Sequence, residues 1–305
     1  MGCGFCDEEK LPEWRALNRL ALGTVQFGLN YGIANHQGRA SHDEAKAILR
    51  HARSSGMDML DTAIAYGDSE QRLGEICIQD WQVVSKLPAV PEACSDISQW
   101  VAGALRKSLQ QLKVKNLHGF LLHRPQQLLK EDGDRLYQAL QQLKHNGFVR
   151  KIGVSIYEPA ELDALCRRYQ FDIVQAPFNI IDRRLIDSGW LSRLAGQGTE
   201  IHVRSVFLQG LLLMTPSNRL KKFNRWASLW SKLEDWLNDT ELTPLQACLR
   251  YALSFPEIDK VIVGVDSLNQ LKEILQAAVG PMPQVPKELG VCDVDLLNPT
   301  RWAAL

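Results

Sequence analysis

Four polar side chains in the first half of the chain have types that together could catalyse proton transfer. Asp61 and Tyr66 lie in the segment Asp-Thr-Ala-Ile-Ala-Tyr-Gly, and Lys86 and His123 each end a short apolar run. A tyrosine beside a lysine is typical of acid catalysis, because a nearby ammonium group favours the phenolate that remains after the proton has left. A carboxylate would orient the lysine, and a neutral histidine could donate a hydrogen bond to a carbonyl oxygen. These residues therefore indicate polarisation of a carbonyl group with delivery of a proton.

These four residues can act together only if the chain brings their segments to one place. From Arg19 onward, short apolar or β-branched runs alternate with longer helical patterns, which is typical of βα units around a parallel sheet. Eight such units can be counted, with strands predicted at Arg19–Thr24, Met57–Asp61, Gln82–Lys86, Gly119–His123, Lys151–Ser155, Ile173–Ala176, Glu200–Val206 and Lys260–Val263. A doubly wound sheet would usually have a glycine-rich phosphate turn after its first strand, and residues 23–28 lack that spacing. The sequence therefore predicts an α/β protein built as a closed (β/α)₈ barrel, the TIM barrel.

The chain is expected to form a single domain. No stretch rich in Pro, Gly or Ser separates two halves, so residues 19–305 are predicted to form the barrel and residues 1–18 an N-terminal tail or short extension. Two pairs, Ser41 with Glu44 and Thr243 with Gln246, have the spacing of capping boxes at helix starts.

Cys3 and Cys6 have the spacing of a metal-binding or redox pair. No second Cys/His pair follows at zinc-ligand spacing, and other cysteines lie in apolar segments. We therefore favour reduced core thiols and a tail over a metal site or disulfides, and the role of Cys3 and Cys6 stays open.

Composition argues against two classes of partner. Basic and acidic residues both number 35, and no basic stripe is interleaved with aromatic residues, so nucleic acid is not an expected partner. No stretch approaches the roughly 18 consecutive apolar residues of a membrane span. Met1 to Lys10 also lack a basic region followed by an apolar run. We expect a soluble, cytoplasmic protein without a membrane partner.

In a (β/α)₈ barrel the active site lies at the C-terminal ends of the strands. Polar residues stand there in five predicted strands, as Asp61, Lys86, His123, Ser155 and Gln175. Taken singly, each has an ordinary explanation, such as a helix cap for Asp61 or a surface charge for Lys86. Together they would meet at one mouth, where a buried lysine and aspartate need partners to offset desolvation. We therefore predict an Asp61–Lys86 ion pair, with Tyr66 returning over the same mouth in the following loop.

Short motifs at and around these strand ends occur in a distinctive order. They are Asp61-Thr62-Ala63…Tyr66-Gly67, Ser85-Lys86, Leu122-His123-Arg124-Pro125, Gly153-Val154-Ser155 and the ending Asn298-Pro299…Trp302. As a set, from about Arg19 to Trp302, they resemble the aldo-keto reductase family. The opening at residues 23–35 is similar to a bacterial branch whose members often accompany surface-sugar or secondary-metabolite pathways.

The resemblance implies an activity and roles for the catalytic residues. Aldo-keto reductases transfer hydride from NADPH, or less often NADH, to an aldehyde or ketone without a metal. Tyr66 would be the proton donor, tuned by Asp61 and Lys86. His123 would orient a small carbonyl substrate, which the bacterial branch suggests is sugar-derived or polyol-like. A monomer is the family default.

The same resemblance implies a binding site for the nicotinamide cofactor. Ser155 and Gln175 would hold the nicotinamide carboxamide. The backbone from Gly264 would hold a phosphate at the start of the last helix, where N–H groups and the helix dipole attract anions. The full set of expected contacts is Gly23, Thr24, Ser155, Gln175, Arg204, Ser205, Gln209, Gly210, Gly264, Val265, Ser267 and Gln270.

The sequence departs from the family pattern at several positions. Ile156 follows Ser155 where many relatives carry an asparagine, which removes one possible contact with the carboxamide. Arg204 stands where relatives often carry an aromatic residue that stacks on the nicotinamide. Gly264 and Gln270 stand where relatives that prefer NADPH often carry a lysine or arginine. Ser267 with Gln270 equally fits a capping box. We expect NADPH, with NADH as the alternative.

Two other functions fit parts of the sequence. A regulatory protein could keep the barrel and the cofactor with little turnover, and the departures at Ile156 and Arg204 favour it. A lyase or aldolase could use Lys86 as a Schiff-base nucleophile. A neighbouring carboxylate would keep Lys86 protonated and poorly nucleophilic. Because all four catalytic residues are present, the reductase is the preferred interpretation.

Overall fold

Eight parallel strands form a closed barrel in chain order, with β1 paired to both β2 and β8. The computed structural model describes residues 13–33, 35 and 38–305. The strands are β1 (Leu20–Gly23), β2 (Met59–Asp61), β3 (Gln82–Leu87), β4 (Leu117–Leu122), β5 (Val149–Ser155), β6 (Ile173–Pro177), β7 (Glu200–Arg204) and β8 (Lys260–Gly264). Each predicted strand overlaps an observed one, and the predicted (β/α)₈ barrel is confirmed.

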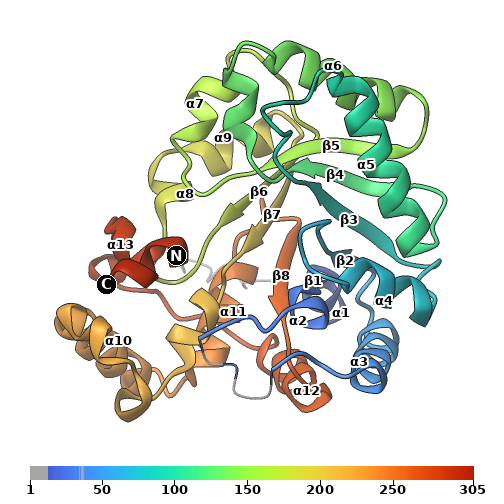
Figure 1. Ribbon diagram of the computed structural model, residues 1–305. Coiled ribbons are helices and arrows are strands. Elements are labelled where there is room, and N and C mark those ends of the chain that lie inside the picture. The colour runs from blue at the N-terminus through green and yellow to red at the C-terminus, as the bar shows by residue number, and fades with distance from the viewer. Residues whose placement is uncertain (1–12, 34, 36–37) are drawn as a thin grey trace, which may run out of the picture.

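Helices follow the strands and surround the barrel, as Figure 1 shows. The longer helices are α3 (His42–Ser54), α4 (Ser69–Ile76), α5 (Ile97–Leu112), α6 (Gly133–His145), α9 (Trp190–Gly196), α10 (Ala227–Asp239), α11 (Pro244–Leu253) and α12 (Leu268–Ala277). The shorter helices are α1 (Glu13–Asn18), α2 (Val25–Gly28), α7 (Glu161–Leu165), α8 (Arg184–Asp187) and α13 (Val294–Leu297), and the 3₁₀ turns are η1 (Pro125–Leu129), η2 (Leu208–Leu213), η3 (Pro216–Asn218), η4 (Lys221–Trp226), η5 (Lys287–Leu289) and η6 (Pro299–Ala304). No helix in the described part of the chain has the length and apolar character needed to cross a membrane.

The predicted N-terminal tail is only partly described. Residues 13–18 of it form α1, which leads into β1. Residues 1–12, with Cys3 and Cys6, lie outside the described residues.

A small apolar cluster inside the barrel explains how the polar residues reach the mouth. Its members are Ala21, Met59, Val84, Leu121, Ile173 and Ile262. Four of them stand two positions before a polar residue of the predicted site, namely Asp61, Lys86, His123 and Gln175. Side chains two apart along a strand point to the same face. The polar side chains therefore point into the same interior, one layer nearer the C-terminal mouth.

One predicted capping box forms and the other does not. Thr243 and Gln246 bond reciprocally at the start of α11. Ser41 accepts a hydrogen bond from the Glu44 N–H at the start of α3, but the Glu44 carboxylate turns elsewhere. Its Oε1 accepts a 2.6 Å hydrogen bond from the backbone N–H of Leu268 at the start of α12. The Ser41–Glu44 prediction was wrong in this half, because the Glu44 carboxylate binds the N-terminus of α12 instead, where the helix dipole also favours an anion.

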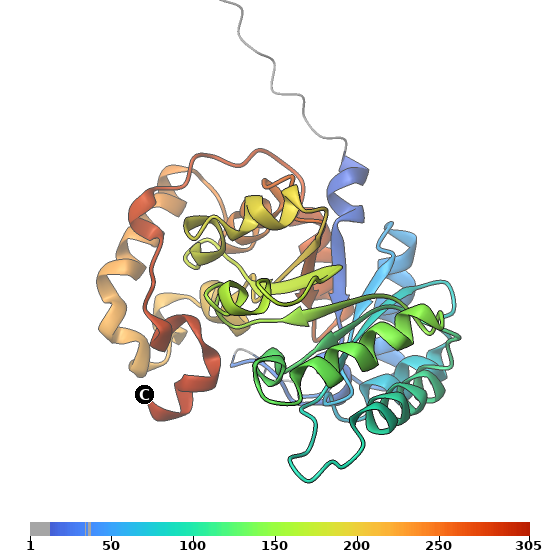
Figure 2. The same ribbon diagram turned by 90° about the horizontal axis from the view of Figure 1, so that it is seen from above.

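The segment after β7 and the C-terminal segment pack together on one side of the barrel. Figure 2 shows α10 beside the C-terminal segment. Trp226 donates a 2.9 Å hydrogen bond from Nε1 to Asp293, and Lys222 donates from Nζ to the Trp302 carbonyl oxygen at 2.6 Å. Trp230 and Trp236 of α10 are buried. These contacts attach η4 to the C-terminal segment.

The surroundings of Gly153 and Gly103 predict opposite effects on stability when each is replaced by alanine. A Cβ added at Gly153 in β5 would lie 2.0 Å from the carbonyl oxygen of Ile173, so Gly153→Ala must push the strands apart. We expect it to lower the free energy of unfolding by about 1–3 kcal/mol, as overpacking does. Gly103 lies on the exposed side of α5 with nothing within 4 Å of an added Cβ. Gly103→Ala should raise stability by up to about 1 kcal/mol, from helix propensity.

Urea unfolding of the two variants and the wild type would measure both shifts. A Gly153→Ala midpoint equal to that of the wild type would contradict the tight contact between β5 and β6.

Candidate active site

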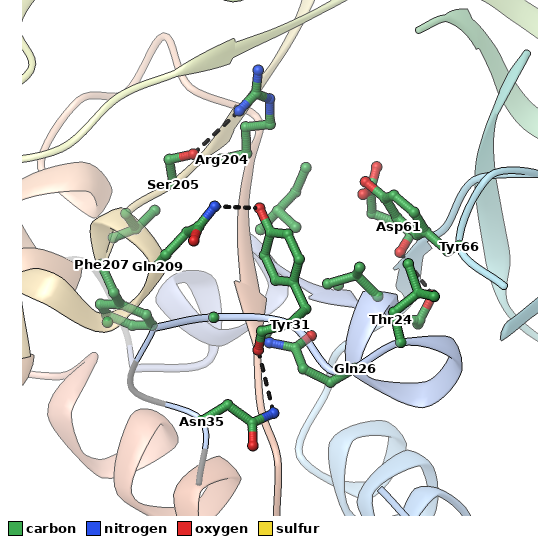
Figure 3. Close-up of a pocket in the computed structure, with 18 of the residues that line it drawn as sticks. Thr24, Gln26, Tyr31, Asn35, Asp61, Tyr66, Arg204, Ser205, Phe207 and Gln209 are labelled. Carbon is green, nitrogen blue, oxygen red and sulfur yellow. Dashed lines mark hydrogen bonds between the residues drawn. The ribbon is translucent and has the colours of Figure 1, made fainter. Parts of the chain in front are cut away.

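A cavity of about 560 Å³ opens at the C-terminal ends of the strands. Its walls come from the loops after β1, β2, β4, β5 and β7 and from the start of α12. Figure 3 shows Tyr31, from the first of these loops, lying between Gln209 on one side and Asp61 with Tyr66 on the other. The cavity therefore lies where the barrel geometry places a catalytic site.

Lys86 is the buried centre of the hydrogen-bond network at the bottom of this cavity. Its side chain is 1% exposed, and its Nζ lies 2.6 Å from Oδ1 of Asp61. Nζ also donates to the Thr62 carbonyl oxygen at 2.9 Å and lies 3.5 Å from the Tyr66 hydroxyl oxygen. Burial alone would lower the pKa of Lys86, but the Asp61 carboxylate and Tyr66 raise it by more, so that the pKa lies above its ordinary value. Lys86 is therefore an ammonium ion, and a poor nucleophile for a Schiff base.

Asp61 connects Lys86 to a second pair of predicted site residues. Its Oδ2 accepts a 2.7 Å hydrogen bond from Nε2 of Gln175. The Ser155 hydroxyl donates in turn to Oε1 of Gln175 at 3.1 Å. An amide has two N–H donors and two acceptor lone pairs, so Gln175 keeps one of each for another partner. Ser155, Gln175, Asp61 and Lys86 thus form one continuous chain of hydrogen bonds that ends at Tyr66.

The loop that carries Tyr66 is fixed by its backbone. The Tyr66 N–H donates to the Ala63 carbonyl oxygen at 3.0 Å. Gly67 follows with φ of +60°, which a residue with a side chain rarely adopts. Gly28 of α2 packs so closely that an added Cβ would lie 1.8 Å from the Tyr66 carbonyl oxygen. These two glycines let the loop fold back so that the phenol reaches Lys86.

His123 lies directly after β4 and faces Tyr66. Its backbone N–H donates to the Leu87 carbonyl oxygen at 3.0 Å, which continues the pairing of β3 with β4. The two rings lie 6.0 Å apart between centroids, edge to face. Burial lowers the pKa of His123 from 6.5 to about 4, and the positive charge of Lys86 acts in the same direction. The imidazole is therefore neutral near pH 7 and keeps an N–H for donation.

The structure places most of the predicted cofactor contacts on the cavity wall. Those that line it are Gly23, Thr24, Ser155, Gln175, Arg204, Ser205, Gln209, Gly210, Gly264 and Gln270. Val265 and Ser267 do not line it, because Val265 is buried in the core and Ser267 caps α12. Of the predicted catalytic residues, Asp61, Tyr66 and His123 line the cavity, whereas Lys86 lies beneath it.

Thr24 lines the cavity, but its hydroxyl group is bonded within the protein. Its hydroxyl donates to the Asp61 carbonyl oxygen at 3.0 Å and accepts from the Ser69 hydroxyl at 3.0 Å. Both bonds are buried, and they connect β1 and α4 to the end of β2. Thr24 therefore helps to position Asp61.

Three N–H groups at the start of α12 already have partners within the protein. Leu268 donates to the Glu44 carboxylate, Gln270 donates to the Ser267 hydroxyl at 3.3 Å, and the Asp266 N–H donates to Oε1 of Gln270 at 2.7 Å. Asp266 and Glu273 also line this side of the cavity. The predicted phosphate site at this helix start would have to compete with these bonds and with three carboxyl groups.

The loop after β7 carries an unusual backbone. Ser205, Leu208 and Gln209 have φ of 61°, 47° and 54°, and Gly210 follows with φ of 90°. Residues held in the left-handed region cost free energy and cluster at ligand-binding loops. Gln209 donates from Nε2 to the Tyr31 hydroxyl at 3.1 Å, so this loop meets the loop after β1 across the cavity (Figure 3).

Arg204 contacts a residue of the cavity wall, Tyr157, that the sequence had not assigned to the site. Its Nη2 donates to the Ile156 carbonyl oxygen at 2.8 Å, and its guanidinium carbon lies 4.8 Å from the ring centroid of Tyr157. The guanidinium carbon of Arg124 lies 5.8 Å from the same centroid. Tyr157 stands two positions after Ser155, and Arg124 directly follows His123, so their spacing was the available signal.

Comparison with known proteins agrees with this geometry. The family profile described as "Aldo/keto reductase family" matches residues 19–285. The chain belongs to the aldo/keto reductase family. This is a family of oxidoreductases, and the expected family membership is confirmed.

Two relatives match the chain over most of its length. The uncharacterized oxidoreductase YqkF of Bacillus subtilis is 24% identical over 285 residues, which are 86% of this chain and 91% of that protein. L-galactose dehydrogenase of Arabidopsis thaliana is 25% identical over 299 residues, 87% of this chain and 88% of that protein.

Solved structures of this family share the fold. Aldo-keto reductase AKR11C1 from Bacillus halodurans, in its holo form, has a TM-score of 0.69 at 20% identity, covering 87% of this chain and 88% of that one. PA4992 from Pseudomonas aeruginosa, a putative aldo-keto reductase by its description, has a TM-score of 0.62 at 22% identity, covering 85% and 88%. At these identities the likeness concerns the fold alone.

The low pKa of His123 predicts a pH dependence that can be isolated. Between about pH 6.5 and pH 4 the unfolded chain binds a proton on this histidine that the folded protein does not bind. The folded state therefore loses stability as the pH falls through this window. We expect the wild type to lose more stability than His123→Gln between pH 7 and pH 4.5, measured by urea unfolding at both values. Equal losses in the two proteins would contradict a neutral, buried His123.

Proposed function

We propose that this protein reduces an aldehyde or ketone to an alcohol, with NADPH or NADH as the hydride donor and Tyr66 as the proton donor. The observation that carries the proposal is the buried Lys86 ammonium group, which is bonded to Asp61 and lies 3.5 Å from the Tyr66 oxygen. Membership of an oxidoreductase family supports it.

The roles of the side chains follow from charge and position. When Tyr66 releases its proton to the substrate oxygen, the Lys86 ammonium group stabilises the phenolate that remains. Asp61 holds Lys86 in place and keeps it charged. Neutral His123 donates a hydrogen bond to the same carbonyl oxygen and so polarises the carbonyl group. Each group thus stabilises charge that develops during the reaction.

The cavity has features that suit a nicotinamide cofactor, which supplies a hydride when it is bound. Ser155 and Gln175 lie at its base, and Gln175 keeps a free donor and acceptor for a carboxamide. Oε1 of Gln26 is buried without a hydrogen-bond partner among residues 13–33, 35 and 38–305. An added Cβ at Gly264 would lie 2.5 Å from Gln26 Nε2, so the bare backbone there allows this close packing.

The charges near α12 bear on the choice between the two nucleotides. NADPH is usually selected by a charge-assisted contact to its 2′-phosphate. Among the described residues on this side of the cavity we find Asp266, Gln270 and Glu273, and no lysine or arginine. We therefore infer that NADH binds at least as well as NADPH, contrary to the preference expected from the family.

The substrate is proposed to be a small carbonyl compound derived from a sugar. The name of L-galactose dehydrogenase, which matches this chain over 87% of its length, supports this class. The regulatory alternative keeps the cofactor site and predicts little turnover.

Replacing Tyr66 by phenylalanine tests the function directly. We expect Tyr66→Phe to lower kcat about 10²- to 10⁴-fold, the usual contribution of a positioned proton donor, while NADH and NADPH still bind. Turnover is followed at 340 nm with a panel of aldehydes, ketones and sugars, and binding is followed by titration of tryptophan fluorescence. Tyr137→Phe is a matched control, because Tyr137 bonds to the Gln170 carbonyl oxygen on the outer surface. A wild type that binds the nucleotides but reduces none of the carbonyls would support the regulatory alternative, and full activity of Tyr66→Phe would exclude Tyr66 as the donor.

A further inference from the structure

Two arginines at the mouth of the cavity have no carboxylate partner. Within the described residues, neither Arg124 nor Arg204 forms an ion pair with an acidic side chain, although both line the cavity. Arg184, which donates to the Tyr157 carbonyl oxygen at 3.4 Å, is by contrast paired with Asp182 at 2.8 Å. Arg124 and Arg204 thus lack a neutralising carboxylate, whereas the nearby Arg184 has one.

Both guanidinium groups have hydrogen-bond donors to spare. An arginine carries five N–H donors in a planar fork. Arg204 uses one on the Ile156 carbonyl oxygen and one on the Ser205 hydroxyl at 3.2 Å, which fix its position and leave three. The Arg124 side chain makes no hydrogen bond in the part of the chain that the structure describes, and its guanidinium group contacts the Tyr157 ring. A planar fork with free donors matches a carboxylate or phosphate.

The positive charges lie on the side of the mouth where the substrate oxygen would sit. Arg124 directly follows His123, and both arginines contribute to the low pKa of that histidine. The acidic residues on the cavity wall do not neutralise them. Asp61 is paired with Lys86. Asp266 and Glu273 follow β8, which stands opposite the β4 end that carries Arg124 and next to the β7 end that carries Arg204, and within the described residues neither forms an ion pair with either arginine.

We propose that Arg124 and Arg204 form an anion-binding subsite of the active site, and that the carbonyl substrate carries a carboxylate or phosphate group that these arginines bind. This inference rests on the proposed reductase function, because it takes His123 and Tyr66 to mark the position of the carbonyl group. The anion relieves the repulsion between the two guanidinium groups and directs the other end of the substrate toward His123.

Matched pairs of substrates test the subsite. 4-Carboxybenzaldehyde is compared with its methyl ester, and glyceraldehyde 3-phosphate with glyceraldehyde. We expect kcat/KM to be higher for the charged member of at least one pair, and Arg124→Gln to reduce this preference about tenfold, the effect of one lost charge-assisted hydrogen bond. Arg124→Lys, which keeps the charge and loses the fork, should retain part of the preference. Arg106→Gln, on the exposed side of α5, is the control and should leave the preference unchanged.

A binding measurement separates failure of the subsite from failure of the reductase function. Calorimetric titration of Tyr66→Phe with 4-carboxybenzaldehyde and its ester reports the preference without turnover. Tighter binding of the acid, together with an inactive wild type, would uphold the subsite and refute the reductase function. Turnover with equal kcat/KM for charged and uncharged substrates in both pairs would refute the subsite alone. If Arg124→Gln weakens binding of NADH and NADPH and leaves the substrate preference unchanged, the anion belongs to the cofactor and the proposal is overturned.

Discussion

A lysine ammonium group buried at the mouth of the barrel is the constraint on which the rest of the site depends. Taking such a charge out of water is costly, and removing its partner from a buried pair typically costs about 3–5 kcal/mol. Lys86 offsets this cost with the Asp61 carboxylate and the Thr62 carbonyl oxygen. Its remaining neighbour is the Tyr66 hydroxyl. The same charge that must be neutralised for the protein to fold is therefore held beside the proposed proton donor.

The barrel strands fix the relative positions of Asp61 and Lys86. Asp61 and Lys86 end neighbouring strands, and the register of β2 with β3 fixes their separation. Gln175 comes from β6, across the interior, and bonds to the second oxygen of Asp61 at 2.7 Å. Two neighbouring strands and a third across the ring thus fix the position of one carboxylate. An ion pair supported in this way loses little freedom during a reaction, which is the condition for electrostatic stabilisation of a transition state.

The periodic parts of this arrangement could be predicted from the sequence. Buried parallel strands have short apolar runs, and a polar residue that ends such a run in a barrel points to the mouth. That reasoning predicted the eight strands and the pairing of Lys86 with Asp61, and the structure has both. It also placed His123 and Gln175 at the same mouth, because the end of an apolar run can be located in a sequence. The conformation of the loop that follows cannot be located in this way.

Contacts between distant loops could not be predicted in this way. Glu44 has the local spacing of a capping box, yet its carboxylate binds the Leu268 N–H at the start of a helix more than two hundred residues away in sequence. This long-range bond occupies a backbone N–H group at the start of α12, where the sequence predicts a phosphate site. The positions of Arg124 and Tyr157 depend likewise on how two loops fold over the barrel, and no periodic pattern encodes that. Which charged side chains pair across the cavity therefore depends on the three-dimensional arrangement of the loops.

The central claim, that Lys86 acts through Tyr66, is tested most directly by a double-mutant cycle of kcat with Lys86→Met, Tyr66→Phe and the combined variant. Each protein is first checked for nucleotide binding and near-ultraviolet circular dichroism, so that only folded variants are compared. Residues that act as a unit are strongly non-additive. We predict that the combined variant is no slower than Tyr66→Phe alone, because Lys86 has no phenolate left to stabilise. If the two losses multiply instead, Lys86 contributes independently of Tyr66 and the account is contradicted.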